Sequence, residues 1–411
     1  MAAIHPFRAL RYSPDVIHDL SRVIAPPYDV IEAEEQERLY QASSYNIVRL
    51  ILGKQYPTDT SEDNRYTRAA ADFANWRKNQ VLRQDPTPAL YVIEHQFASG
   101  GAMRSRLGFI ALLELGESIE RSVYRHEATL AAPKEDRTRL LEAVPANLEP
   151  IFCVLPDRDG TVQGILRGLT KRERMTAAGT LHGEAVFVWV ITDPDVIQQV
   201  TRQLSSVAVL IADGHHRFEV AVAHRARYGT VMAYCVSMED PALEVWPIQR
   251  VVQYSSKASL QSLQGVCVVQ PASDLAEVLR WLTAEGAEGR FGCYDGRGWS
   301  CVTVEPERLA AWLMAPPMPL PLAVLDVSLL HGLILPNLGA DGADRAGVRY
   351  TAEVSQAVRM VDRGQGSSAW LLRGLSLKQV YALATQGLTL PSKSTYFHPK
   401  VPSGLMINPL A

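Results

Sequence analysis

The richest group of chemically capable side chains lies in IADGHHRFEVAVAHRARY, residues 211–228. Two histidines and an arginine follow Asp213 and Gly214, where an apolar run gives way to a helical pattern. A strand, a tight turn and a helix in this order would aim backbone N–H groups at an anion such as phosphate. Arg217 would add a charge-assisted bond, while His215 and His216 would be biased toward the neutral form. The alternative is an ordinary helix start, in which Asp213 caps the helix and both histidines face water.

A second group stands in RHEATLAAPKEDR, residues 125–137. Its candidate acid–base, metal-binding and phosphate-binding residues are His126, Glu127, Lys134, Asp136 and Arg137. The helical zinc motif HExxH is missing, because Leu130 stands where the second histidine would be. The alternative is a solvated helix start whose charges form local ion pairs that add little to stability.

The third group is LPSKSTYFHPKVPSGLM, residues 390–406. It combines cations and hydroxyls between prolines: Lys393, Ser394, Thr395, Tyr396 and Lys400. No helical or alternating pattern explains these residues, so we expect a loop that can bind an anion. The GxxxxGK(S/T) arrangement of the Walker phosphate loop is missing, so the pattern alone does not predict ATP. A packed loop without a ligand is the alternative.

Strands and helices must position these groups, and the sequence supplies both. Apolar runs typical of buried strands occur at 151–155, 186–192, 207–211 and 231–237. Helical spacing predicts helices at 60–82, 194–204 and 215–228, and a β-hairpin is expected from 89–97 and 104–115. The chain should therefore have a mixed α and β fold. We expect a soft boundary near Ser255 and another near the proline run at 316–321.

Composition limits the classes of function. The chain has 411 residues, of which 47% are hydrophobic and 21% charged, so it can bury a large core in two or three domains. Its net charge of -3 argues against a broad surface for nucleic acid or anionic membrane. No apolar run is long enough to span a bilayer, and we expect a cytoplasmic protein that binds no membrane. The five cysteines show no CxxC spacing and are expected to be buried free thiols.

Four motifs together resemble one bacterial and archaeal family, domain of unknown function 1015. They are VIAPPYDVI (23–31), RHEATLAAPKEDR (125–137), IADGHHRFEVA (211–221) and LPSKSTYFHPKVPSGL (390–405), in the order and spacing of that family. The resemblance runs from about Ile4 to Met406. Three positions depart from the family pattern: Gln249 replaces a usual histidine, and Phe218 and His398 stand where tyrosine is more common. Gln249 cannot titrate as a histidine would.

The resemblance extends to the ParB/sulfiredoxin superfamily, whose members bind nucleotide phosphates with a similar turn and helix. Free serine kinases of that superfamily carry nearly the same motif. The resemblance therefore implies that five residues bind nucleotide phosphate: Asp213, Gly214, His215, His216 and Arg217. It also implies an α+β fold, with a ParB/sulfiredoxin-like catalytic region at 1–255 and a C-terminal α/β region at 256–411 that carries the KSTYF loop.

We accordingly expect a nucleotide-dependent phosphotransferase that uses ATP or ADP with Mg²⁺ and acts on a small hydroxyl metabolite, first of all free serine. Glu127 or Asp136 would take the hydroxyl proton or hold Mg²⁺, with His126 and His216 as further catalytic candidates. The cations and hydroxyls expected to hold phosphate are Lys134, Arg137, Lys393, Ser394, Thr395 and Lys400. One alternative is a phosphate-ester hydrolase, similar to a phosphoserine phosphatase, in the same pocket. The other is a nucleotide-dependent nucleic-acid-binding protein like ParB itself.

Overall fold

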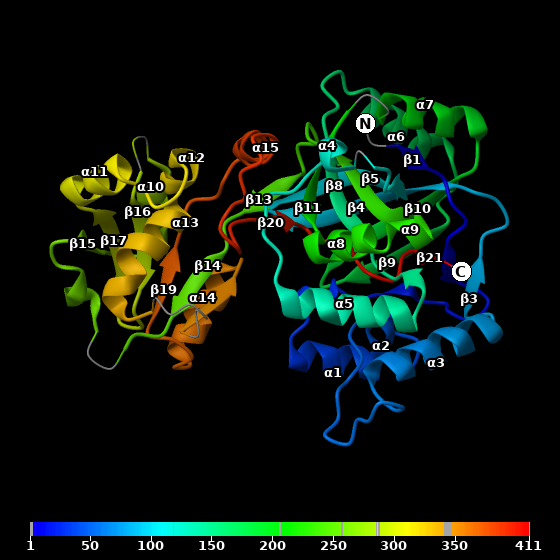
Figure 1. Cartoon of the computed structure of the whole chain (residues 1–411), viewed down its shortest axis with the longest axis horizontal. Coiled ribbons are helices and arrows are strands. Elements are labelled where there is room, and N and C mark those ends of the chain that lie inside the picture. The colour runs from blue at the N-terminus through cyan, green and yellow to red at the C-terminus, as the bar shows by residue number, and fades with distance from the viewer. Residues whose placement is uncertain are drawn as a thin grey trace. The chain divides into compact units, whose positions relative to one another are not determined.

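The computed structural model describes the chain except residues 1–2, 118, 205–206, 256–257, 285, 287, 341–346 and 411. The chain divides into two compact units (Figure 1). The first consists of residues 1–244 and 399–411, and the second of residues 245–398. Residues 256–257, where the division expected from the sequence falls, lie outside the described residues. The roles assigned to regions 1–255 and 256–411 stay predictions.

A mixed sheet forms the centre of the first unit. Its strand order is β6 (Val123–Tyr124), β11 (Val209–Asp213), β8 (Ile151–Leu155), β12 (Thr230–Ser237), β5 (Ala102–Glu114), β4 (Leu90–Ser99), β10 (Glu184–Ile191) and β9 (Ala177–Leu181), and β1 (Ile4–His5) pairs with β5. The pairs β12–β8 and β11–β6 are parallel, whereas β11–β8, β12–β5, β4–β5 and β10–β4 are antiparallel. The predicted hairpin is therefore confirmed as β4 and β5, and the four predicted strands all lie in this sheet.

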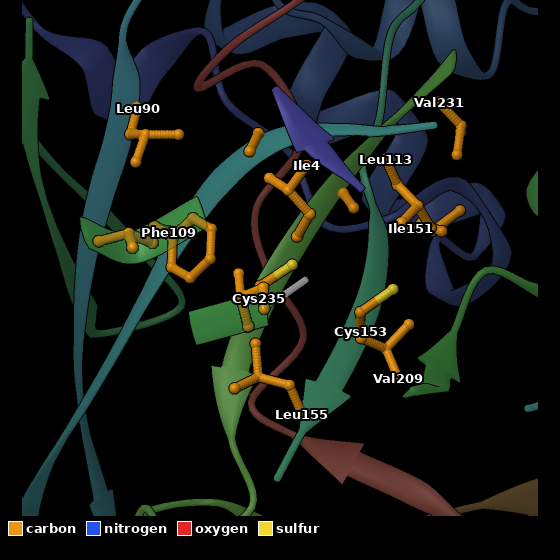
Figure 2. Packing of buried hydrophobic residues seen from close by; sticks show 14 of the residues in the cluster. Ile4, Leu90, Phe109, Leu113, Ile151, Cys153, Leu155, Val209, Val231 and Cys235 are labelled. Carbon is orange, nitrogen blue, oxygen red and sulfur yellow. The ribbon is translucent and has the colours of Figure 1, made fainter. Parts of the chain in front are cut away.

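One face of the sheet packs against helices α6 (Thr161–Arg172), α7 (Pro194–Leu204) and α8 (His215–Ala223). Alternate residues of a strand face the same way, so Ile151, Cys153 and Leu155 enter one apolar cluster (Figure 2). Strand β8 is buried along its whole length, which explains why its sequence IFCVL is continuously apolar. All five cysteines are free and buried, as the sequence predicted.

A second apolar cluster holds a layer of helices beside the sheet (Figure 1). The layer contains α1 (Ala33–Ala42), α2 (Val48–Ile51), α3 (Arg65–Lys78) and α5 (Ala131–Ala143), with the short strands β2 (Leu10–Tyr12) and β3 (Leu82–Gln84). Asn64 begins α3 with a capping box, because its side chain accepts from the Thr67 N–H while Thr67 bonds back to the Asn64 N–H. Strands β7 (Ala146–Asn147) and β21 (Asn408–Pro409) pair, so the C-terminal segment is part of this unit.

The second unit contains a six-stranded sheet. Its order is β15 (Cys267–Ala272), β17 (Trp299–Val304), β16 (Arg290–Tyr294), β19 (Ser368–Leu371), β14 (Gln249–Val252) and β18 (Val348–Thr351). Helices α10 (Leu275–Thr283) and α14 (Val354–Asp362) pack on this sheet. Further α-helices in the described part of this unit are α11 (Pro306–Met314), α12 (Leu320–Ala323), α13 (Asp326–Leu329) and α15 (Leu377–Thr385).

The mixed α+β architecture predicted from the sequence is confirmed. The predicted helix 194–204 has the observed bounds of α7. The predicted helix 215–228 is divided, because the chain leaves helical geometry at His224 and continues as α9 (Arg225–Tyr228). No helix in the described part of the chain is long and apolar enough to cross a membrane.

Candidate functional site at the start of helix α8

Asp213 ends β11, and α8 begins two residues later. Gly214 joins them in the left-handed region, with φ of 87°. A side chain here would be strained, and its Cβ would lie only 3.1 Å from atoms of the Arg217 guanidinium. The turn that the sequence predicted as the start of a phosphate-binding helix therefore forms, and it depends on glycine.

The Asp213 carboxylate binds two cations. It accepts a hydrogen bond from Arg217 Nη2 at 2.9 Å, and its other oxygen accepts one from Lys400 Nζ. Gly214, not Asp213, is the N-cap of α8, and no side chain supplies a capping hydrogen bond there. The capping role considered for Asp213 is therefore wrong, because its oxygens are held by the cations.

Arg217 is a buried part of this cluster. Its side chain is only 10% exposed, and its Nη1 donates to the carbonyl oxygen of Pro150. Asp213 and the Pro150 carbonyl hold the guanidinium in place, and a phosphate role for Arg217 stays a prediction. Its Nε is buried and has no hydrogen-bond partner among the described residues.

The charges around Asp213 fix its protonation state. Burial acts to raise the pKa of Asp213, but Lys400 and Arg217 outweigh burial and lower this pKa to about 2. The carboxylate is therefore ionised at any physiological pH. An acid this strong is a weak proton acceptor, so Asp213 is suited to orient cations rather than to act as a general base.

Two buried histidines flank the carboxylate. His126 and His215 meet edge to face, with ring centroids 4.6 Å apart. Burial lowers the pKa of His126 to about 4 and also lowers that of His215, although the charge of Asp213 acts in the opposite direction. The alternative in which His215 faces water is thus wrong. Both rings are neutral at pH 7 because they are buried.

His216 and Glu219 connect α8 to the segment before α5, which lies against α8 (Figure 1). His216 Nε2 accepts a hydrogen bond at 3.0 Å from the N–H of Leu130, the N-cap residue of α5. Glu219 accepts a hydrogen bond from Thr129 at 2.6 Å and pairs with Lys134 at 3.1 Å. Hydrogen bonds and an ion pair therefore join the motif at 125–137 to the motif at 211–221. Glu127, which follows His126 in the sequence and precedes Thr129, is half-buried.

Asp136 has a different environment from the one predicted. Its carboxylate accepts a hydrogen bond from Tyr66 Oη at 2.7 Å and one from Arg137 Nε at 2.8 Å, and it also pairs with Arg65. Burial acts to raise the pKa of Asp136, but Arg137 and Tyr66 outweigh it, and the pKa is lowered. These partners join α5 to α3. We therefore interpret Asp136 as a packing residue rather than a catalytic base.

Glu149 is a buried carboxylate beside the candidate site, and the sequence analysis missed it. It is 5% exposed and accepts hydrogen bonds from the Tyr28 N–H at 3.0 Å and from Ser403 Oγ at 2.9 Å. It also lies 3.7 Å from Arg137 Nη1, and the Arg137 guanidinium covers the Tyr28 ring at 3.8 Å. One carboxylate thus joins the N-terminal, KEDR and C-terminal motifs. A lone acidic residue in the apolar stretch AVPANLEPIF was the available signal.

The C-terminal motif is shared between the two units. Lys400 and Ser403 belong to the first unit, whereas Lys393, Ser394 and Thr395 belong to the second. In the second unit the Lys393 carbonyl accepts a hydrogen bond from Arg250 Nη2 at 2.9 Å. A phosphate role for Lys393, Ser394 and Thr395 stays a prediction.

Gln249, which replaces the histidine usual in the family, is buried in the second unit. Its Oε1 accepts a hydrogen bond from the Leu372 N–H at 3.0 Å, so the side chain joins β14 to the segment after β19. The amide provides a structural bond there and no titratable group.

The described residues contain no group of three or more His, Cys, Asp or Glu side chains placed to hold a metal ion. Mg²⁺ can still bind proteins through one or two carboxylates together with the phosphates of a substrate. Within the described part of the chain, a Mg²⁺ ion would therefore depend on the phosphates of a bound nucleotide for most of its ligands.

Comparison with known proteins identifies the family. The model of the family described as "Protein of unknown function (DUF1015)" matches residues 4–328, so the chain belongs to that family. The match ends before the C-terminal motif. No curated protein matches the chain.

Several solved structures are loosely similar. A conserved hypothetical protein from Pyrococcus furiosus has 13% identity and a TM-score of 0.38, over 73% of this chain and 95% of its own. A free serine kinase in complex with AMP has 13% identity and a TM-score of 0.36, over 70% and 86% of the two chains. A C-terminally truncated SbnI from Staphylococcus aureus has 12% identity and a TM-score of 0.36, over 73% and 87%.

Proposed function

We propose that this DUF1015 protein is a nucleotide-dependent phosphotransferase that acts on a small hydroxyl metabolite, with free serine as the first candidate. The observation that carries the proposal is the cluster at the start of α8. There Asp213 orients Lys400 and Arg217 beside a left-handed glycine and a helix N-terminus. The cluster unites motifs that lie up to 187 residues apart in the sequence.

The start of α8 has the donors that a phosphate needs. The first N–H groups of an α-helix have no acceptor within the helix, and the helix dipole favours a negative charge at that end. Lys400 adds a cation whose direction Asp213 fixes, and a fixed cation loses little entropy when an anion binds. Phosphate is thus the ligand class that this geometry suits best.

The histidines fit the same chemistry. His216 accepts a hydrogen bond at Nε2, which leaves its proton on Nδ1 as a donor. His126 and His215 are neutral at pH 7, so they add no charge that a bound phosphate must balance. Phosphoryl transfer depends mainly on positioning and charge stabilisation, which a site with cations and no obvious nucleophile can supply.

The acceptor hydroxyl needs a proton acceptor in some transfer mechanisms. Glu127 keeps that proposed role, because it is adjacent in sequence to His126 and its side chain is only half-buried. Asp136 no longer shares it, since Arg65, Tyr66 and Arg137 hold its carboxylate between two helices. The choice of serine rests on the resemblance of the ADGHHR motif to the free serine kinases.

Ligand binding and turnover test the proposal in two steps. Thermal shift with ATP, ADP and AMP, with and without Mg²⁺, should show an increase in Tm, because a ligand that binds the folded state stabilises it. Incubation with nucleotide and serine should then give phosphoserine. Release of inorganic phosphate without phosphoserine would indicate a hydrolase instead. Nucleotide-dependent binding of duplex DNA, with no phosphoserine formed, would contradict the proposal and favour the ParB-like alternative.

A further inference from the structure

A groove with a volume of about 540 Å³ lies along α8, beginning at Phe218 and Glu219. Phe218, Val222, Ala223 and Ala226 contribute to its lining, and Ile119 lies among the other lining residues. The groove therefore has an apolar portion along the helix. Its size is that of a site for a nucleoside-sized molecule.

Polar side chains border the same groove. Glu219 and Arg125 both line it, and they pair with each other at 3.2 Å. The Glu219 side chain remains 24% exposed although Thr129 and Lys134 also bond to it. Arg125 is 46% exposed, so its planar guanidinium can move to cover a ring bound in the groove.

Helix geometry connects the groove to the proposed phosphate site. His215, Phe218 and Val222 are spaced by three and four residues and lie on one side of α8. At a rise of about 1.5 Å per residue, Phe218 and Val222 lie roughly 5 to 10 Å along the axis from the first turn. That distance is similar to the separation between the phosphates and the base of a nucleotide.

We infer that this groove binds the nucleoside part of the nucleotide, with the base against the apolar portion lined by Val222, Ala223 and Ala226 and a ribose hydroxyl donating to Glu219. The inference rests on the proposed function, because it takes the phosphates to be at the start of α8. A carboxylate is the acceptor that ribose hydroxyls commonly find in nucleotide sites.

Other ligands fit the groove less well. A serine molecule has no apolar surface to cover Val222 and Ala226, and it would leave most of the volume filled with water. Inorganic phosphate could pair with Arg125 or Arg225, but it would leave the apolar portion of the groove uncovered. A nucleoside covers the apolar portion and also offers hydroxyl donors to the carboxylate.

The test fills the groove without touching the phosphate site. Ala223 is exposed on α8 and lines the groove, so Ala223→Trp places an indole there with little demand on the core. Ala226→Trp, also exposed and lining the groove, is a second variant should the first fail to fold. Ala74→Trp is the matched control, because Ala74 is an exposed alanine within α3, which lines no part of this groove.

Calorimetry would measure the affinity of each variant for ATP and for tripolyphosphate. Ala223→Trp should weaken ATP binding by roughly tenfold or more and leave tripolyphosphate binding unchanged. Ala74→Trp should bind both ligands as the unaltered protein does. Unchanged ATP affinity in folded Ala223→Trp and Ala226→Trp would overturn the groove assignment alone. Equal loss of both ligands would also overturn it. If the unaltered protein binds neither ATP nor tripolyphosphate, the proposed function fails and the inference fails with it.

Discussion

Asp213 and Asp136 are each paired with two cations in the same unit. Lys400 and Arg217 hold Asp213, whereas Arg65 and Arg137 hold Asp136. The side chains of Asp213 and Asp136 have similar exposures, 13% and 17%. For both carboxylates the neighbouring cations outweigh burial and lower the pKa. Charge and burial alone therefore do not separate a candidate site from a packing contact.

Their surroundings differ. Asp136 joins helix α5 to helix α3 and receives a third bond from the Tyr66 hydroxyl. Asp213 precedes a left-handed glycine and a helix N-terminus, and two buried neutral histidines lie beside it. The comparison teaches that the elements around a carboxylate, here a left-handed glycine and a helix N-terminus, distinguish the candidate site better than its ion pairs do.

The largest effect is expected from removing the packing carboxylate. Asp136→Asn leaves Arg137, whose side chain is 6% exposed, and Arg65 without their shared counter-charge. Breaking a buried pair from one side costs about 3 to 5 kcal/mol, so urea unfolding should show a loss of that order. ATP affinity of the folded variant should be nearly unchanged. Asp15→Asn is the control, because the Asp15–Arg83 pair is largely exposed and should contribute less than about 1 kcal/mol.

A slightly smaller effect is expected from acid. The folded-state pKa of His126, about 4, is lower than its ordinary value of 6.5, so the unfolded chain binds more protons in that window. Stability should thus be full above pH 6.5 and fall as pH decreases toward 4, by about 3 kcal/mol from this residue. His126→Asn should flatten the pH dependence of the free energy of unfolding between these limits. If the free energy of unfolding of His126→Asn depended on pH as it does in the unaltered protein, the lowered pKa of His126 would be refuted.

The smallest effect on stability is expected from Lys134→Ala. Its side chain is 39% exposed and its pair with Glu219 is partly solvated, so urea unfolding should change by less than about 1 kcal/mol. If Lys134 serves phosphate binding, ATP affinity should nevertheless decrease. A large loss of stability with unchanged ATP affinity would place Lys134 with Asp136 as a packing residue.

Local patterns explain how much of the fold was predictable. Strand β8 and helix α7 are readable because their apolar spacing reflects the faces they bury. Gly214 is readable because left-handed geometry demands a particular residue type, whereas the helix predicted at 60–82 begins only after Asn64. The break at His224 was missed, since the sequence on both sides of it favours helix.

The partners within the site were less predictable. Most lie far apart in sequence: Lys400 meets Asp213 across 187 residues, and Ser403 meets Glu149 across 254. A single sequence carries no record of such contacts. The sequence placed both Asp136 and Asp213 in the site, because both stand among basic residues and only the folded chain shows that Asp136 faces a neighbouring helix.

ATP affinity of two matched variants tests the central claim most directly. Lys400→Met and Arg65→Met each remove one cation from an aspartate of similar exposure, and each keeps an apolar side chain in its place. The account predicts that Lys400→Met weakens ATP binding by roughly tenfold or more, while Arg65→Met changes it by less than about twofold even though it destabilises the fold. Equal losses in both folded variants, or unchanged affinity in Lys400→Met, would contradict the claim that the start of α8 is the phosphate site.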